Sequence, residues 1–375
     1  MNLDKIRKEI DSIDKSLCEL INKRMDLSKE VAEYKIENNM PVFDRVRENA
    51  ILDKVANESE EYADQLKKIY SSIMEQSKSI QYSMIGGNIR DNFVAAPSPD
   101  EVKTVACQGV EGAYSHLTAL ALYKNADVLF YDTWKEVCNA VKKGEAEYGI
   151  LPVENSWAGS VHEVYDLLIN GDFYISLCAD ARICHNLIGL KGAKKEDITT
   201  VLSHPQALAQ CSDYLKQNGY VKEQMANTAM AVKKVSEIKD IHKAAIGSKY
   251  SAQIYSLDIL DSSIASSKNN TTRFVSISNK PQIMEKTDKI SVVLSLDNKS
   301  GTLYNLLARF ASCNMNLTKL ESRPTKQKQF EYIFYIDFEG NLHDKKTLGV
   351  LTTVESDLPY FKLLGNYPEF NITLE

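Results

Sequence analysis

Apolar residues recur with helical spacing through the first part of the chain. From Leu3 to about Tyr34 they return every three or four positions, which is the seam of one long amphipathic helix. Pro41 would end that helix, and Asp44 would cap the next one. A third helix is marked by Leu66, Ile69, Ile73, Ile80 and Met84. The pattern therefore predicts an all-helical N-terminal domain.

The first predicted helix is long for a domain of this size. About 32 residues would span roughly 48 Å, more than a compact domain of such a length needs. We therefore expect the helix to pack against another chain. Arg24 falls in the seam itself. Because a buried guanidinium without an anionic partner is costly, Arg24 should meet either a carboxylate of the protein or an anionic ligand.

The pattern changes after GGNIRDNFVAAPSPD, a stretch from Gly86 to Asp100 whose glycines, prolines and small polar residues suit a linker. Short strand candidates then alternate with helical stretches, which is typical of an α/β domain. The candidates are TVACQG, DVLFYD, YGILPVE, ITTVLSH and KAAIGS.

The last part of the chain predicts a small α+β domain. Its order is strand KISVVLSLD, helix LYNLLARFASC, strands LTKLESR and FEYIFYIDFEG, helix KTLGVLTTVESDL and final strand FKLLGNY. That order suggests a βαββαβ, ferredoxin-like unit. We therefore divide the multidomain chain into residues 1–86 (all-α), a linker at 87–102, residues 103–281 (α/β) and residues 288–375 (α+β).

Composition argues against a membrane-spanning, secreted or nucleic-acid-binding protein. The chain is 43% hydrophobic and 26% charged, and it has no apolar run long enough to span a bilayer. Its start, MNLDKIRKEID, does not resemble a secretory signal. A net charge of −6 provides no general field for nucleic acid. Seven cysteines without a metal-ligand spacing suggest reduced thiols, so we expect a cytoplasmic protein.

The helical segment carries a set of charged and polar residues at positions 7–81: Arg7, Arg24, Lys35, Asp44, Arg47, Glu48, Ser77 and Gln81. This set resembles the active site of the all-helical class of chorismate mutase, and the resemblance covers essentially all of residues 1–90. It implies that chorismate is rearranged to prephenate, without a nucleophile or a proton transfer, by residues that bind two carboxylates and stabilise charge on the ether oxygen.

Helix geometry agrees with this resemblance. Ser77 and Gln81 are four residues apart and share a helix face, as do Asp44, Arg47 and Glu48. By contrast, Arg7 would lie roughly 25 Å from Arg24 along a straight helix. If Arg7 serves such a site, a second chain must complete it. The resemblance therefore implies an intertwined homodimer or a higher homo-oligomer.

Roles for these residues also follow from the resemblance. Arg7 of a partner chain, Arg24 and Arg47 would hold carboxylates. Lys35 and Gln81 would face the ether oxygen. Asp44 and Glu48 would bind the ring hydroxyl, and Ser77 would support them.

Between the linker and Pro281 no Walker loop, GxSxG elbow or HExxH motif occurs. Alone, GVEGAYSH would be a tight strand-to-helix turn and TTRF an ordinary strand. Together GVEGAYSH, GILPVENSWAGSV, SHPQALAQC, NTAMAV, AAIGS and TTRF, in that order, resemble prephenate dehydratase. The resemblance implies two α/β lobes around a cleft. The functional positions it indicates are Glu154, Asn155, Ser156, Ser203, Gln206, Gln210, Thr228, Thr272 and Arg273.

The dehydratase reaction removes carbon dioxide and water from prephenate, and the ring becomes aromatic. The enzyme must help the 4-hydroxyl to leave, and no cofactor or metal is needed. By resemblance, Thr272 would act at that hydroxyl, and Arg273 would be a carboxylate or structural partner. His204 and His116 lack an evident nucleophile partner. His204 precedes a proline and should set a turn, and Cys211 should be a buried thiol.

The βαββαβ segment resembles an ACT domain, a module that binds small ligands between paired copies. ESRP at Glu321–Pro324 accompanies phenylalanine binding in the dehydratase family, and the family's GAL motif appears here with Thr302 in place of alanine. The resemblance implies feedback inhibition by phenylalanine. The implied effector residues are Gly301, Thr302, Leu303, Asn314, Glu321, Ser322, Arg323 and Pro324.

Several alternatives stay open at the level of sequence. The C-terminal domain could be an oligomerisation module with a degraded site. Arogenate, which carries an amino group in place of the keto group, could replace prephenate. A non-catalytic regulator that binds a small molecule in a two-lobed cleft is the alternative from another class.

Overall fold

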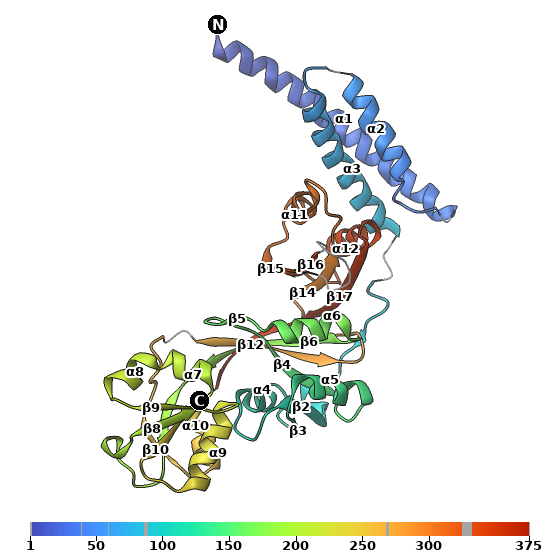
Figure 1. Ribbon diagram of the computed structural model, residues 1–375. Helices are drawn as coiled ribbons and strands as arrows, with labels where there is room; N and C mark the ends of the chain where they lie inside the picture. Colours follow the sequence, from blue (N-terminus) through green and yellow to red (C-terminus); the bar gives the residue numbers. More distant parts are fainter. Residues whose placement is uncertain are drawn as a thin grey trace. The chain divides into compact units, whose positions relative to one another are not determined.

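The structure is a computed structural model, and it describes residues 2–38, 40–58, 60–85, 89–267, 270–324 and 332–374. The chain forms two compact units (Figure 1). The first unit combines Met1–Asn92 with Ile290–Leu363, and the second combines Phe93–Lys289 with Leu364–Glu375. Within the described ranges, no helix has both the length and the apolar composition that crossing a membrane requires.

Three helices form the N-terminal part of the first unit: α1 (Leu3–Glu37), α2 (Arg45–Asn57) and α3 (Ala63–Ile85). The predicted long helix, the start of the second and the existence of the third are confirmed. Asp44 caps α2, since its Oδ1 accepts a hydrogen bond from the Arg47 backbone N–H at 2.9 Å. Both α1 and α2 pack along α3.

The apolar seam of α1 is exposed in the single chain. Only Ser28 and Ala32 of this 35-residue helix are buried. The helix is about 52 Å long, so α3, with 23 residues, covers only part of it. The seam residues that stay more than 40% exposed are Leu3, Ile10, Ile13, Leu17, Leu20, Leu27, Val31 and Tyr34.

The C-terminal part of the first unit has the predicted βαββαβ order. Its sheet runs β15-β16-β14-β17, so β15 is an edge strand. A buried Phe310–Phe338 pair, with ring centroids 4.9 Å apart, joins one helix to this sheet. The elements are β14 (Lys289–Ser295), α11 (Thr302–Ser312), β15 (Leu317–Pro324), β16 (Tyr332–Glu339), α12 (Lys345–Asp357) and β17 (Tyr360–Tyr367).

Helix α12 packs closely against α3 within the first unit. A Cβ added at Gly349 would lie 3.1 Å from the backbone oxygen of Ser79, so the two helix backbones approach tightly there. The Tyr82 hydroxyl also hydrogen-bonds the Ser356 hydroxyl at 2.5 Å. The helical segment and the C-terminal segment therefore share a packed, hydrogen-bonded surface.

The second unit has two lobes, as the resemblance implies. The first lobe holds a seven-stranded sheet in the order β18-β6-β12-β4-β2-β3, with β5 (Gly159–Ser160) paired to β4. Val105, Ile150 and Phe274 belong to its buried core. Its other elements are β2 (Thr104–Gln108), α4 (Tyr114–Leu122), β3 (Asp127–Tyr131), α5 (Trp134–Lys143), β4 (Tyr148–Asn155), α6 (His162–Asn170), β6 (Tyr174–Ile183), β12 (Thr271–Ser278) and β18 (Glu369–Leu374).

The second lobe is inserted between β6 and β12. Its five-stranded sheet has the order β11-β7-β10-β8-β9, with β10 parallel to β8 and antiparallel to β7. Clusters around Val201 and Leu202 form its core. Its elements are β7 (Asn186–Gly189), η2 (Lys195–Asp197), β8 (Thr200–Ser203), α7 (Pro205–Gln210), α8 (Ser212–Gln217), β9 (Val221–Gln224), α9 (Thr228–Ile238), β10 (Lys243–Gly247), α10 (Lys249–Ile254) and β11 (Asp258–Asp261).

Two connections were not predicted from the sequence. FKLLGNY is not the final strand, because β18 follows it and pairs in parallel with β6, from Glu369 opposite Cys178 onward. The predicted linker at 87–102 is in part regular structure, because within it β1 (Val94–Ala95) pairs with β13 (Gln282–Ile283), and a short helical turn η1 (Pro99–Glu101) follows. These pairings fix both ends of the second unit's long segment.

Gly365 provides a test of how the chain returns to the second unit. A Cβ at this position would lie 2.1 Å from the backbone oxygen of Ile175, a contact that no side-chain rotation relieves. We expect Gly365→Ala to destabilise the second unit by about 2 kcal/mol or more, measured by urea unfolding. Gly340→Ala is the control, because its nearest atoms belong to side chains at 3.2 Å and beyond. Equal unfolding midpoints for the two variants would contradict this close approach.

Candidate functional site

Arg24 extends from α1 to α3. Its Nη1 donates a hydrogen bond to the Ser77 Oγ at 2.5 Å, and it lies 3.5 Å from the Ile73 backbone oxygen. Ser77 is buried and itself donates to the Ile73 oxygen at 3.0 Å. Within the described part of the chain these partners are neutral oxygens, so the carboxylate partner allowed by the sequence is not found. The guanidinium keeps its charge available for an anionic ligand.

Lys35, Asp44 and Glu48 lie around the connection from α1 to α2. The Lys35 Nζ donates to the Val42 backbone oxygen at 2.6 Å. Burial lowers the pKa of Lys35, while Asp44 and Glu48 oppose that shift electrostatically. The predicted ammonium and both predicted carboxylates are therefore within electrostatic reach of one another.

The other predicted mutase residues occupy different environments. Gln81 is 7% exposed, and its Oε1 has no hydrogen-bond partner among the described residues. Arg47 is exposed on α2. Arg7 is exposed on α1, 3.9 Å from Asp4, and lies roughly 25 Å along the helix from Arg24. One chain thus brings most of the set to the α1–α2–α3 surface and leaves Arg7 remote.

Lys78, next to Ser77 in sequence, is a buried residue that the sequence analysis missed. Its side chain is 5% exposed, and its Nζ lies 3.1 Å from the Glu48 Oε1 and 2.9 Å from the Glu75 Oε1. A lysine in a polar stretch of an amphipathic helix gives no local signal of burial. Only the tertiary packing reveals its contact with a predicted site residue.

The two lobes of the second unit enclose a cavity of about 310 Å³. None of its described lining residues is Asp, Glu, Lys or Arg, so its polar groups are amides, hydroxyls, imidazoles and an indole. The lining residues are Gln108, Ala113, Tyr114, Ser115, Trp134, Pro152, Asn155, Ile183, His185, His204, Gln206, Ala207, Gln210, Ala226, Asn227, Thr228, Asn270, Thr272 and Phe274.

Asn155, at the end of β4, joins the two lobes beside this cavity. Its Nδ2 donates to the Thr272 Oγ1 at 2.9 Å, and its Oδ1 accepts from the Gln206 Nε2 at 2.9 Å. Thr272 is on β12 of the first lobe, and Gln206 is on α7 of the second. Because the Thr272 oxygen accepts from Asn155, the Thr272 hydroxyl proton remains for a group in the cavity.

A second polar cluster lines the cavity and was not predicted in full. His185 is buried between the Gln210 Oε1, 2.8 Å from its Nε2, and the Tyr114 hydroxyl, 3.1 Å from its Nδ1. Asn270 donates to the same Gln210 oxygen at 2.9 Å and accepts from Asn155 at 3.0 Å. Burial lowers the pKa of His185, which favours a neutral imidazole. Asn155 and Gln210 were singled out from the sequence, whereas His185, Asn270 and Tyr114 were not. His185 and Asn270 stand outside the quoted motifs, and Tyr114 lies in GVEGAYSH without a role assigned to it.

Four predicted dehydratase residues do not line the cavity: Ser203, Ser156, Glu154 and Arg273. The Ser203 hydroxyl is fully buried and donates to the Ile246 backbone oxygen at 3.0 Å. The Ser156 Oγ accepts from the Thr271 N–H at 3.0 Å. Glu154 lies 3.8 Å from the Arg273 guanidinium. These side chains hold strands and turns around the cavity, whereas Thr228 lines it at the first residue of α9.

Arg273 faces the neighbouring strands. It makes a bidentate pair with Asp180 at 2.7 and 2.8 Å and lies 2.9 Å from a Glu369 oxygen. The Asp180 hydrogen bonds, which outweigh burial, keep the Arg273 pKa above its ordinary value. Of the two roles predicted for Arg273, these contacts favour the structural one. Cys178, Asp180 and Glu369 have metal-ligand spacing, but both carboxylates already pair with Arg273, so we assign no metal there.

The remaining predictions for this unit concern turns and a thiol. The His204 Nδ1 accepts from the Gln206 N–H at 3.2 Å and so caps α7, as expected for a turn residue. The His116 Nδ1 accepts from the Gly112 N–H at 3.0 Å and holds the GVEGAYSH turn, where Gly112 has a φ of +87°. Cys211 is fully buried, which raises the pKa of its thiol to about 12.

The predicted effector residues fall in three places in the C-terminal segment. Gly301, Thr302 and Leu303 begin α11, where the Thr302 Oγ1 lies 2.6 Å from the Lys299 oxygen and 2.8 Å from the Asp297 oxygen. Asn314 follows α11 with a φ of +52°. Glu321, Ser322, Arg323 and Pro324 form the outer end of the edge strand β15.

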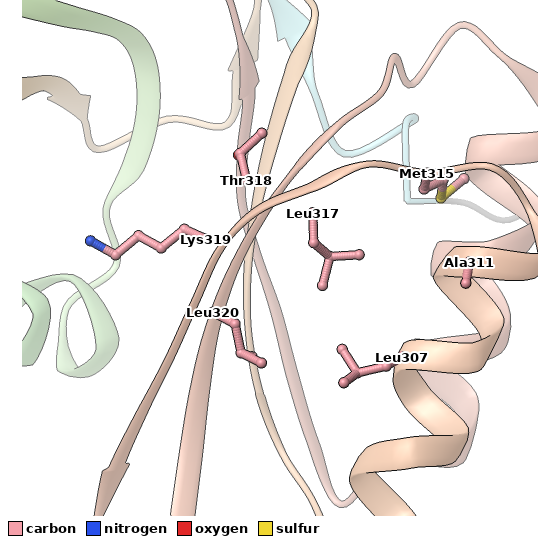
Figure 2. Close-up of a pocket in the computed structure, with 7 residues that line it drawn as sticks. All are labelled: Leu307, Ala311, Met315, Leu317, Thr318, Lys319 and Leu320. Atoms are coloured by element: carbon pink, nitrogen blue, oxygen red, sulfur yellow. The ribbon is translucent and has the colours of Figure 1, made fainter.

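A mainly apolar cavity of about 370 Å³ lies between α11 and β15. Figure 2 shows Leu307 and Ala311 on the helix facing Leu317 and Leu320 of the strand, with the Lys319 ammonium turned away from the helix. The other lining residues are Met315 and Thr318, so none of the predicted effector residues lines this cavity.

Comparisons with known proteins match both the helical segment and the two-lobed segment. A family model described as chorismate mutase type II matches residues 6–82, and one described as prephenate dehydratase matches residues 105–282. A bifunctional chorismate mutase/prephenate dehydratase of Buchnera aphidicola from Acyrthosiphon pisum is 30% identical over 98% of this chain and 96% of its own. Arogenate dehydratase/prephenate dehydratase 1 of Arabidopsis thaliana is 35% identical over 79% of this chain and 81% of its own.

A solved structure is also similar. Prephenate dehydratase of Arthrobacter aurescens, in complex with L-Phe, is 27% identical, with a TM-score of 0.65 over 70% of this chain and 89% of its own. Two family models in the same order, and a bifunctional relative that spans nearly the whole chain, leave one assignment. The chain belongs to the family of bifunctional chorismate mutase/prephenate dehydratases.

Proposed function

We propose that this enzyme of phenylalanine biosynthesis uses the α1–α2–α3 surface as its mutase site and the neutral cavity of the second unit as its dehydratase site. Chorismate is rearranged to prephenate at the first, and prephenate becomes phenylpyruvate at the second. The observation that carries the proposal is the Asn155 side chain, which joins Thr272 to Gln206 across the cavity. We keep residues 1–86, 103–281 and 288–375 as the three domains.

The mutase site works by binding and by electrostatics. Arg24 and Arg47 hold the substrate carboxylates, and Lys35 and Gln81 face the ether oxygen as its C–O bond breaks. Three features support this proposal. The Arg24 guanidinium is held by a neutral Ser77, and the carboxylates of Asp44 and Glu48 lie around Lys35. The buried Gln81 Oε1 has no hydrogen-bond partner among the described residues. Because the rearrangement is intramolecular, fixing the reactive conformer supplies much of the acceleration.

A second copy of the chain completes this site. Eight seam residues of α1 are more than 40% exposed, and burying one large apolar side chain is worth roughly 1.5–3 kcal/mol. The α1 helix of a partner chain, packed along this seam, would bury these eight residues. It would also bring the partner's Arg7 to the mutase site that contains Arg24 of the first chain. The functional form is thus an intertwined dimer at least, in which each mutase site takes Arg7 from the other chain.

The dehydratase cavity binds a substrate with two carboxylates without a cationic side chain in its described lining. Ala113, Tyr114 and Ser115 line it at the start of α4, and Ala226, Asn227 and Thr228 line it at the start of α9. The N–H groups at helix starts carry partial positive charge and favour carboxylates. We infer that these two helix starts hold the carboxylates of prephenate.

The chemistry at Thr272 follows from its hydrogen bond with Asn155. As the ring carboxylate leaves as carbon dioxide, the electron pair of that C–C bond enters the ring. The C4–O bond then breaks, and its electron pair stays on the departing hydroxyl oxygen. Thr272 donates its hydroxyl proton to that oxygen, and solvent returns the proton, so one proton is consumed for each water formed.

The nature of the cavity favours prephenate over arogenate. Arogenate carries an ammonium group, which would enter a site without a carboxylate among the described lining residues. The neutral keto group of prephenate requires only hydrogen-bond donors such as the amides present. The alternative of a non-catalytic regulator finds no support, because both domains belong to enzyme families.

The C-terminal βαββαβ segment serves as an ACT domain that binds phenylalanine and inhibits the enzyme. The similar dehydratase of Arthrobacter aurescens was solved with L-Phe, which supports this effector. The Thr302 hydroxyl bonds within its own loop and so adds no open polar group to the pocket. The exposed outer end of β15 suits a pocket completed by a second copy. A cytoplasmic location fits seven cysteines that form no disulfide.

Subunit mixing tests the shared mutase site. Arg7→Ala and Lys35→Ala chains should each lose chorismate turnover while keeping prephenate turnover. Unfolding and refolding them together at equal amounts should restore about a quarter of the wild-type mutase rate, because half of the dimers are mixed and each holds one intact site. The control is Arg7→Ala refolded alone. No recovery in mixtures shown to contain mixed dimers would contradict the intertwined site.

Thr272→Val tests the dehydratase assignment, because it keeps the size of the side chain and removes the proton. We expect prephenate turnover to fall by at least ~100-fold. Chorismate turnover, measured on the same sample, should stay unchanged. Thr271→Val on the opposite face of β12 is the matched control and should keep most of the activity. A Thr272→Val enzyme with full phenylpyruvate formation would rule out the role.

Phenylalanine titration tests the sensor. Adding phenylalanine should lower the rate of phenylpyruvate formation, and Glu321→Ala in the ESRP motif should weaken that response at least ~10-fold. Thr302→Ala restores the family's alanine, and it should leave the inhibition in place. A rate that does not respond at saturating phenylalanine would favour an oligomerisation module with a degraded site.

A further inference from the structure

Lys78 is a buried cation in a position where three acidic side chains converge. Its Nζ lies 3.1 Å from Glu48, 2.9 Å from Glu75 and 3.5 Å from Asp357, and its side chain is 5% exposed. It also lies 4.9 Å from the centre of the Phe43 ring. Burial disfavours the charged form, but the three carboxylates outweigh it and raise the pKa of Lys78. Lys78 is therefore a buried ammonium with a full set of anionic partners.

The same acidic residues also bind a second cation. The Arg309 Nε on α11 lies 2.8 Å from Glu75, and its Nη2 lies 2.7 Å from Asp357 at the end of α12. The cluster thus contains two cations and three carboxylates, contributed by α2, α3, α11 and α12. It lies on the surface where Gly349 and Ser356 pack against α3. The charged side chains of the N-terminal helices and those of α11 and α12 therefore neutralise one another.

Glu48 depends on this cluster for its position. Both of its carboxylate oxygens lie near the Lys78 Nζ, at 3.1 and 3.4 Å, and Lys78 is its one side-chain partner in the described part of the chain. An ammonium on one side of the carboxylate restricts its rotation and leaves its remaining lone pairs for a hydroxyl on the other side. Removal of Lys78 would free Glu48 to turn towards water.

We propose that Lys78 is a positioning residue of the mutase site, which aims Glu48 at the substrate's ring hydroxyl and is itself held by Asp357 of the C-terminal segment. The inference rests on the proposed role of Glu48. Asp357 thus supports the mutase site through Lys78, although it lies far from Glu48 in the sequence. The mutase should therefore respond to changes in the C-terminal segment that touch no mutase residue.

Steady-state kinetics of the full-length chain test the proposal. Lys78→Met keeps the length of the side chain without its charge, and it should raise the KM for chorismate by about tenfold or more, with a smaller fall in kcat. Asp357→Asn should raise the same KM by about threefold, because Glu75 and Glu48 still hold Lys78. Prephenate turnover should not change in either variant and reports that the chain is folded.

The matched control is Lys67→Met on the same helix. Lys67 also reaches α2, at 3.9 Å from Asp53, but it is 44% exposed, and among the described residues its ion-pair partner is not a predicted site residue. Its KM for chorismate should equal that of the wild type. Lys78→Arg keeps the charge and should recover most of the loss. A folded Lys78→Met chain with lower thermal stability and an unchanged KM would show a structural role only. If Lys78→Met does not fold, an unchanged KM in Asp357→Asn would overturn the proposal instead.

Glu48→Gln separates failure of the inference from failure of the proposed site. Unchanged chorismate turnover in Glu48→Gln would remove the role of Glu48, and the Lys78 inference with it. If Glu48→Gln impairs turnover and Lys78→Met does not, only the inference about Lys78 fails. In the double variant the effects on KM should be less than multiplicative, because Lys78 acts through Glu48. Fully multiplicative effects would overturn the positioning role.

Discussion

The ion-pair cluster around Arg273 holds together the strands that carry the proposed dehydratase site. Arg273 on β12 pairs with Asp180 of β6 and with Glu369 of β18, so three adjacent strands share one partly buried network. Lys289, at the start of β14, lies 2.5 Å from the other Glu369 oxygen. The chain leaves the second unit after Lys289 and returns to it at Leu364. The Glu369 carboxylate therefore pairs with the last residue before that departure and lies shortly after the point of return. Thr272 is the residue before Arg273, so its position depends on this network.

The two proposed active sites differ in their electrostatics. The proposed mutase site concentrates charged side chains, because its reaction moves no proton and needs fixed charges near two carboxylates and one ether oxygen. The dehydratase cavity instead has neutral amides, hydroxyls and imidazoles in its described lining. Its substrate must lose a charged carboxylate as neutral carbon dioxide. A strong cation near that carboxylate would stabilise the substrate more than the transition state, whereas a neutral cavity does not oppose its departure.

The sequence predicts those features of the fold that depend on residues close together in the chain. The 3-4 spacing from Leu3 to Tyr34 predicts α1, and Asp44 before an amphipathic run predicts the cap that the structure has. Contacts distant in sequence leave no such signal. Lys78 resembles any surface lysine until Asp357 is brought to it, and Glu369 belongs to a short strand after Pro368 that could not be recognised without β6 beside it. Motif order identified Thr272, but its Asn270 and His185 neighbours became evident only from the packed cavity.

The C-terminal segment contributes side chains to two charge networks, one through its helices and one next to the ends of its sheet strands. Through Arg309 and Asp357 on its helices it reaches the Lys78 cluster beside Glu48. At its strand ends, Lys289 and Glu369 reach the Arg273 cluster beside Thr272. A ligand that prefers one arrangement of this segment would bias the Lys78 cluster, which lies in the same compact unit, by its difference in affinity for the two arrangements. Buried charges suit such coupling, because a small displacement in a poorly screened site changes their energy more than it would change an apolar contact.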